Sequence, residues 1–196
     1  RADEGAAADD FGAATWRCQQ ALTLEPTSRD ALILSCRTLL EQQRRLLIED
    51  RDWTPLATTL AAAEKQVPDS WELSLVKAEL VLLRDGETVM GRALQILWLA
   101  ESTFGQSREF WQQSAKLYEQ WGRTKEADRA LERYQSLVGD TAAAAILRTE
   151  LLSHRRRFSR ANDVLIAARA ADRLGQDRRA LTVEMRIDAE GDTQSA

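Results

Sequence analysis

Residues 110–140 read FWQQSAKLYEQWGRTKEADRALERYQSLVGD and contain two amphipathic segments. Apolar or small residues of the first segment recur at i, i+3, i+4 and i+7, which is one face of an α-helix. These residues are Trp111, Ser114, Ala115 and Tyr118. Gly122 then interrupts the pattern, and a second helical face follows it. The stretch therefore predicts a helical hairpin with a glycine at its turn.

Residues that end helices recur along the whole chain. Proline lacks the backbone donor that a helix needs, and glycine permits the left-handed geometry of a helix end. Such residues stand at Pro26, Pro68, Gly105 and Gly139. Their spacings are 42, 37 and 34 residues, and a further step of 34 reaches Arg173. The hairpin is thus one copy of a repeating unit.

The residues that precede these stops repeat as well. Twelve residues before each stop stands a small or aliphatic residue: Ala14, Leu56, Ala93, Ala127 and Ala161. Eight residues before each stop stands an apolar one: Cys18, Leu60, Leu97, Leu131 and Leu165. Because i and i+4 share a helix face, the same face is predicted to pack five times in the same register.

This pattern resembles the tetratricopeptide repeat family, whose unit of 34 residues is W-x2-L-G-x2-Y, then A-x3-F, then P. Here it is read as Trp111-x2-Ser114-Ala115-x2-Tyr118 and Ala127-x3-Leu131, with Gly139 at the place of the proline. The resemblance covers about residues 9–175. It implies an all-α fold, a right-handed α-α superhelix (solenoid) of antiparallel helix pairs, in which each pair covers its neighbour's apolar face.

The repeats predict one domain over residues 1–190. It consists of a half repeat at 9–26, repeats at 29–68, 69–105, 106–139 and 140–173, and a capping helix at 176–189. Residues 191–196 are predicted to form a disordered tail.

The second and fifth copies depart from the regular unit. The second copy is about eight residues too long, and residues 41–52 predict a first helix extended by about two turns. Asp10-Phe11 and Asp52-Trp53 match the turn that opens the family's second helix. In the fifth copy the packing positions of the first helix are Ala145, Arg148, Thr149 and Leu152. Arg148 is a poor core residue, so that helix is either displaced in register or loosely packed.

The sequence offers no site for catalysis or for a metal or other cofactor. His154 is the only histidine, it lies in an Arg-rich helix end, and no phosphate-binding glycine loop occurs. The run Arg155 to Arg157 is interpreted as a solvated helix end that caps carbonyl groups. RNA binding is the alternative, although it needs a basic stripe through several repeats and the net charge is −4.

Cys18 and Cys36 are expected to be buried thiols, with a bridge between neighbouring helices as the alternative in an oxidising compartment. Trp111 is assigned to the core, and the core is also favoured for Trp98 and Trp121, with exposed anchors as the alternative.

No apolar run approaches the roughly 18 residues of a membrane span. The chain begins with Arg1 rather than Met, so we expect a piece of a longer protein, and the residues favour neither a cytoplasmic nor a periplasmic location.

In the resembled family, the first helix of each repeat lines a concave groove that binds extended peptides or partner helices. The matching positions here are Asp30, Ile33, Arg37, Glu72, Leu75, Glu79, Glu109, Gln112, Lys116, Ala143, Ile146 and Glu150. They largely lack the basic and amide residues that hold a terminal carboxylate in some family members. We therefore expect a partner segment of mixed apolar and basic character.

The sequence thus predicts a non-catalytic scaffold that binds a protein or peptide partner in a groove. The alternative is the repeat arm of a larger multidomain enzyme or of an export or assembly machine. Nucleic-acid binding is disfavoured, and self-association through the uncapped first helix is a further hypothesis.

Overall fold

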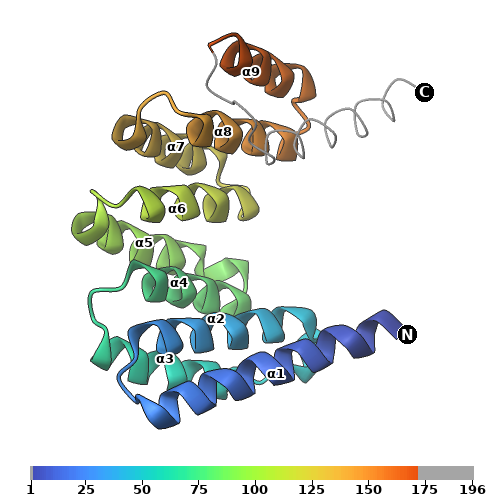
Figure 1. The fold of residues 1–196 in the computed structure, drawn as a ribbon, viewed down its shortest axis with the longest axis vertical. Coiled ribbons are helices and arrows are strands. Elements are labelled where there is room, and N and C mark those ends of the chain that lie inside the picture. Colours follow the sequence, from blue (N-terminus) through green and yellow to red (C-terminus); the bar gives the residue numbers. More distant parts are fainter. Residues whose placement is uncertain (1, 172–196) are drawn as a thin grey trace. The chain divides into compact units, whose positions relative to one another are not determined.

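The computed structural model describes the backbone of residues 2–171, and the side chains of residues 13–86 and 88–171. Within this part of the chain all regular structure is helical (Figure 1). The α-helices are α1 (Ala2–Leu24), α2 (Arg29–Arg45), α3 (Thr54–Gln66), α4 (Trp71–Asp85), α5 (Met90–Phe104), α6 (Arg108–Gln120), α7 (Thr124–Val138), α8 (Ala142–His154) and α9 (Phe158–Ala170). Two short 3-10 turns are η1 (Ile48–Asp50) and η2 (Glu87–Val89).

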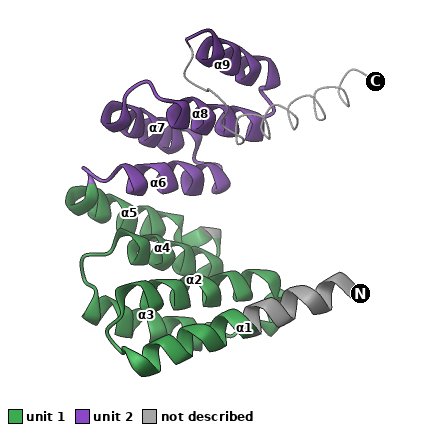
Figure 2. Ribbon diagram, viewed as in Figure 1, with its two compact units in different colours: residues 1–104 green, residues 105–196 purple. Residues whose placement is uncertain are grey.

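The chain divides into two compact units, residues 1–104 and residues 105–196 (Figure 2). In the first unit α1 packs on α2, α2 on α3, and α4 on α5, while α2 also contacts α4. In the second unit the pairs are α6 with α7 and α8 with α9, and α6 also contacts α8. Each unit is therefore built from helix pairs whose first helices lie next to each other, as in an all-α helical repeat.

The helices end at the predicted stops. Four second helices finish one or two residues before Pro26, Pro68, Gly105 and Gly139. Gly139 has φ +72° and ψ −162°, a conformation that glycine adopts far more readily than residues with a side chain, and its N–H donates to the carbonyl of Gln135. The prediction of one continuous domain over residues 1–190 stays a prediction. Arg173, the capping helix 176–189 and the tail 191–196 lie outside the described residues.

The repeated packing positions are buried as expected, except Ala14 in α1, which is half-buried. Leu56, Ala93, Ala127 and Ala161 have no exposed surface. The apolar residues four positions later are also buried, from Cys18 in α1 to Leu165 in α9. Small side chains recur at the first position because the two helices of a pair cross closely there, and a larger residue would overpack the crossing.

The predicted two-turn extension of the second copy's first helix is only half present, since α2 has 17 residues against 13 in α6 and is longer by about one turn. Helix α2 ends at Arg45, and a loop with the turn η1 holds the other additional residues. The side chain of Arg51 donates to the backbone carbonyls of Leu46 and Arg44, at 3.1 and 3.4 Å. These bonds satisfy carbonyl groups at the helix end and so fix the point at which α2 stops.

The predicted turn at Asp10-Phe11 is wrong, because α1 runs unbroken from Ala2 to Leu24. The segment before Asp10 is rich in alanine, the residue with the highest helix propensity, and it continues the helix. The matching turn at Asp52-Trp53 is confirmed. There the Asp52 carboxylate accepts a hydrogen bond of 2.9 Å from the backbone N–H of Thr54, where α3 begins.

In the fifth copy the first helix is displaced in register. Arg148 is exposed, and the buried residues Ala144, Leu147 and Leu151 each lie one position before a predicted packing position. Ala145 and Thr149 remain buried as expected. A rotation of the buried face thus places the guanidinium of Arg148 in solvent and lets α8 keep a full apolar contact surface.

The two repeats of the second unit turn in the same way between their helices. The Arg123 N–H donates to the Tyr118 carbonyl at 2.8 Å, and the Arg157 N–H donates to the Leu152 carbonyl at 2.9 Å. In both turns the preceding residue is left-handed, Gly122 with φ +67° and Arg156 with φ +54°. This is the Schellman helix end, in which glycine is preferred at the left-handed position.

We expect Arg156→Gly to raise the free energy of unfolding by about 0.5–1 kcal/mol. The left-handed conformation costs a residue with a side chain about 1–2 kcal/mol, and the greater flexibility of glycine in the unfolded chain offsets roughly half of that gain. Urea unfolding monitored by circular dichroism measures the change. Gly122→Arg should have the opposite sign, and a gain in stability in that variant would contradict this account of the turn.

Candidate functional site

The predicted groove residues of the first unit lie on the neighbouring helices α2 and α4. Ile33 and Leu75 are buried in the core, so a partner cannot reach them in this structure. Asp30 and Arg37 are exposed, and Glu72 and Glu79 are partly exposed. These four charged side chains are therefore what α2 and α4 can offer at the predicted positions.

Interactions between α2 and α4 occupy most of these charges. Arg29 lies 3.5 Å from the Glu72 carboxylate, and Arg44 forms an ion pair with Glu79. The guanidinium of Arg37 lies over the ring of Trp71, 5.9 Å from its centroid. Arg29 and Arg44 thus neutralise Glu72 and Glu79 within the unit. These two arginines are not among the predicted groove positions, so the predicted positions alone overstate the negative charge.

In the second unit, Lys116 on α6 pairs with Glu150 on α8 at 2.9 Å. Gln112 and Glu109 lie one and two turns nearer the start of α6, beside a hollow of about 520 Å³. The hollow is lined by Arg108, Glu109, Gln112, Tyr134, Leu137, Val138, Thr141 and Ala143. Three predicted groove residues, Glu109, Gln112 and Ala143, therefore meet at one site.

The helix ends position the side chains of this hollow. Ser107 caps α6, since its hydroxyl accepts a hydrogen bond of 3.1 Å from the Phe110 N–H. Arg108 donates to the Glu109 carboxylate at 2.6 Å, and this hydrogen bond lowers the pKa of Glu109 below its ordinary value. Thr141 caps α8 in the same manner as Ser107 caps α6. The site thus presents an ionised carboxylate and an amide.

The apolar side of the hollow was not predicted from the sequence. Leu137 and Val138 come from the last turn of α7, and Leu137 keeps 38% of its surface exposed. Their position directly before Gly139 could have indicated this role, because α7 ends there next to the start of α8. The hollow therefore combines aliphatic surface with hydrogen-bonding groups, as ligand sites commonly do.

The basic run 155–157 does not act as one patch. Arg155 donates to both carboxylate oxygens of Glu119, at 2.6–3.0 Å, and to Asp128 at 2.8 Å. The hydrogen bonds to Glu119 raise the pKa of Arg155 above its ordinary value. Arg156 and Arg157 are exposed. The prediction of a solvated helix end that caps carbonyl groups is therefore wrong for Arg155, which is nearly buried and binds carboxylates of α6 and α7, whereas Arg156 and Arg157 lie at the surface.

Both cysteines are free and buried, as expected for core thiols. Burial raises the pKa of the Cys36 thiol to about 11, which keeps it protonated and unreactive near neutral pH.

Among the residues that the structure describes, no cluster of three or more His, Cys, Asp or Glu is arranged to hold a metal ion. No helix in that part of the chain is long and apolar enough to cross a membrane.

These features define an all-α helical-repeat protein, and the fold is that of tetratricopeptide repeat proteins. The chain is similar to the crystal structure of a thermophilic TPR protein from Thermus thermophilus, with a TM-score of 0.64 and 20% sequence identity. The similarity covers 95% of this chain and 93% of that chain. No family model matches the sequence, and no curated protein matches it significantly.

Proposed function

We propose that the protein is a non-catalytic scaffold that binds an extended segment of a protein partner along the first helices of its repeats. The hollow beside α6 is proposed as the subsite that anchors the segment. The observation that carries the proposal is the meeting of Glu109, Gln112 and Ala143 in this hollow with the aliphatic side chains at the end of α7. The same role would serve a repeat arm within a larger assembly.

The ion pairs refine the chemistry of the proposed partner. Glu72, Glu79 and Glu150 each have a basic partner on the neighbouring first helix. Glu109 pairs with Arg108 as well, so four of the five predicted groove carboxylates are already neutralised. A strongly basic partner segment is therefore disfavoured, and one aliphatic side chain flanked by hydrogen-bonding backbone fits the hollow better.

The ion pairs also decide which residue should be changed. Reversing the charges of Glu72 and Glu79 would break contacts between α2 and α4, so lost binding would be confounded with lost packing. Gln112 lines the hollow and is partly exposed. Its replacement by arginine fills the hollow without removing a charged pair that the structure shows.

We expect Gln112→Arg to weaken peptide binding by about tenfold or more, because loss of an anchor contact in an interface costs more than about 1 kcal/mol. Peptides would be selected against the full chain from a random phage-displayed library, and the affinity of one selected peptide measured by fluorescence anisotropy. Leu137→Ala should weaken the binding of the same peptide, since it removes aliphatic surface that lines the hollow.

Gln113→Arg is the matched control, because Gln113 is the exposed neighbour on α6 and does not line the hollow. The control should bind the peptide as the wild type does. Equal affinity of the wild type and Gln112→Arg, or equal weakening by Gln112→Arg and Gln113→Arg, would contradict the proposal.

A further inference from the structure

The loop between α2 and α3 exposes three consecutive aliphatic residues, Leu46, Leu47 and Ile48. Leu47 keeps 67% and Ile48 keeps 82% of its surface exposed. Glu49 and Asp50 follow them and are exposed too. This segment, loop 46–50, lies within the additional residues of the second copy. The repeat of α6 and α7 has only three residues between its helices, so the fold does not require such a loop.

Several hydrogen bonds fix the shape of loop 46–50. The Asp50 N–H donates to the Leu47 carbonyl at 3.0 Å, and the Arg51 N–H donates to the Ile48 carbonyl at 3.4 Å. The side chain of Arg51 binds the carbonyl of Leu46 and lies over the ring of Trp53 at 5.9 Å. These bonds hold the backbone from which the aliphatic side chains project, and an ordered backbone lowers the entropy lost on docking.

The charge that loop 46–50 presents is negative. The neighbouring basic residues are engaged: Arg44 with Glu79, Arg45 with Glu41, and Arg51 with backbone carbonyls. Neither Glu49 nor Asp50 forms an ion pair with a residue that the structure describes. The loop thus offers two exposed aliphatic side chains followed by two carboxylates, and its complement is an apolar surface bordered by cations.

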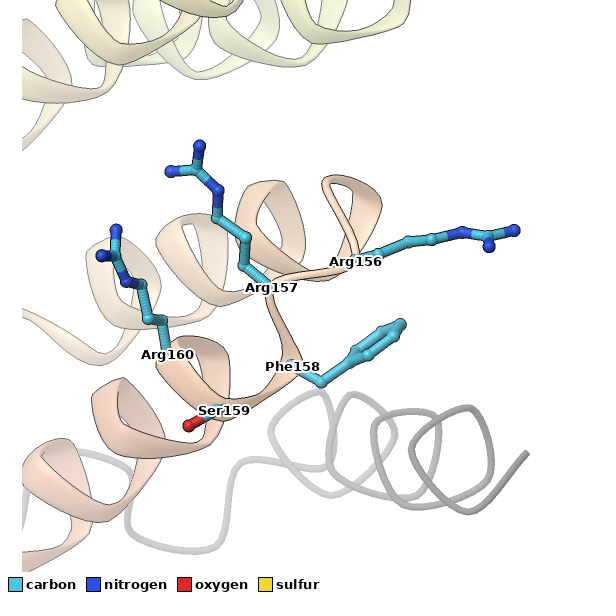
Figure 3. A pocket seen from close by; sticks show the side chains of 5 residues that line it. All are labelled: Arg156, Arg157, Phe158, Ser159 and Arg160. Carbon is cyan, nitrogen blue, oxygen red and sulfur yellow. The ribbon is translucent and has the colours of Figure 1, made fainter. Parts of the chain in front are cut away.

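The second unit carries such a surface at the start of α9. A hollow of about 520 Å³ is lined by Arg156, Arg157, Phe158, Ser159 and Arg160, and we call it the arginine hollow. Arg157 and Arg160 extend in the same direction, whereas Arg156 and Phe158 extend toward the other side (Figure 3).

The charge of the arginine hollow is positive. None of its arginines forms an ion pair with a described residue. The backbone N–H groups at the start of α9 also add positive potential, since no side chain caps this helix.

We propose that loop 46–50 of one copy of this chain docks in the arginine hollow of a second copy. Glu49 and Asp50 pair with Arg157 and Arg160, which extend to one side of the hollow, and Leu47 and Ile48 contact the aliphatic stems of these two arginines. The contact joins two different surfaces, and every copy carries one of each. It is therefore heterologous, and association continues into a ring or an open chain of copies.

A second copy is favoured over a lipid surface on grounds of charge. Anionic membranes attract basic segments and repel carboxylates, and the arginines beside the loop are already bound. The proposal is independent of peptide binding at α6, because it uses other residues and predicts another observable.

The test is sedimentation velocity of the full chain over a range of concentrations at low and high salt. The wild type should show an average mass that rises with concentration and falls at high salt, because salt screens the charge pairs. Leu47→Ser with Ile48→Ser should raise the midpoint concentration of association at least about tenfold, since burial of an aliphatic side chain contributes that much to affinity. Leu99→Ser with Ile166→Ser is the matched control, with 66% and 58% exposure.

Charge exchange tests the pairing itself. Glu49→Lys with Asp50→Lys, and separately Arg157→Glu with Arg160→Glu, should each abolish association. An equimolar mixture of these two variants should restore it, because the basic loop of one then meets the acidic hollow of the other. Circular dichroism of each variant should show the helix content of the wild type, as a control for retained folding.

Three results would overturn the proposal. They are a wild type that stays monomeric at every concentration, association unchanged by the loop and hollow variants, and a mixture of the charge variants that does not associate. Binding to anionic vesicles that depends on Leu47 and Ile48, without self-association, would assign the loop to a lipid surface instead.

Discussion

Replacing Arg155 with alanine is expected to destabilise the second unit by about 3–5 kcal/mol, because it leaves the nearly buried carboxylate of Glu119 without a cation. Only 11% of the Arg155 side chain and 8% of the Glu119 side chain are exposed. The guanidinium also holds Asp128 and the carbonyl of Thr124, so one substitution removes contacts to both α6 and α7. Urea unfolding followed by circular dichroism measures the loss.

Arg148→Ala is the control for this prediction, because Arg148 is exposed on α8 and has no described ion pair. Its free energy of unfolding should change by no more than about 0.5 kcal/mol. The double variant Arg155→Ala with Glu119→Ala should recover part of the loss, since no unpaired buried charge remains. A loss below about 1 kcal/mol in Arg155→Ala would show that the pair is solvated and unimportant for stability.

Trp111→Ala is expected to cost about 3–5 kcal/mol, the range for removal of a large buried aromatic side chain. Trp111 is 3% exposed, and its ring meets Phe110 edge to face with centroids 5.2 Å apart. Its indole N–H donates to the Gly105 carbonyl at 2.9 Å, so alanine also leaves that acceptor without its partner. Thermal unfolding of this variant and of the wild type would measure the effect.

Trp98→Ala provides the comparison, since Trp98 lies on α5 with 51% of its surface exposed. We expect Trp98→Ala to lower the free energy of unfolding by about 1 kcal/mol or less, because about half of this side chain is exposed to solvent in the folded protein. Trp111→Phe should fall between the two, since it keeps most of the apolar contact and loses the hydrogen bond. Equal destabilisation by Trp111→Ala and Trp98→Ala would mean that Trp111 is not part of a packed core.

The helix ends and the core could be predicted from the sequence because both rest on local chemistry. Proline and glycine end helices whatever surrounds them, and the small residues before each stop mark a crossing that recurs in every repeat. The spacing from each stop therefore identifies Ala93, Ala127 and Ala161 as packing residues, and all three are fully buried.

The details that failed depend on contacts between distant residues. The end of α2 is fixed by Arg51, which follows it in a separate loop. The start of α1 depended on a family pattern that its alanine-rich segment does not follow. For the fifth copy, the sequence left a displaced register and loose packing open. A helix can rotate about its axis against its neighbours, and the sequence does not show by how much. The burial of Leu147 and Leu151 shows that the register is displaced.

The candidate site was predicted only in outline. Glu109, Gln112 and Ala143 were placed by the resemblance, whereas Leu137 and Val138 were missed because they belong to a second helix. The acidic character of the groove positions was misleading for a physical reason. A charge count along one set of positions omits the partners, and Arg29 and Arg44 supply the missing cations from adjacent positions.

The contacts of Arg155 have a consequence for how the second unit comes apart. In a repeat array each helix pair touches only its neighbours, so a terminal pair can detach while the remainder stays folded. Arg155 stands at the end of α8 and holds residues of both α6 and α7. Detachment of α8 must break this contact at the same moment as the apolar interface. The two repeats should therefore exchange their amide hydrogens as one cooperative block rather than melting from the end inward.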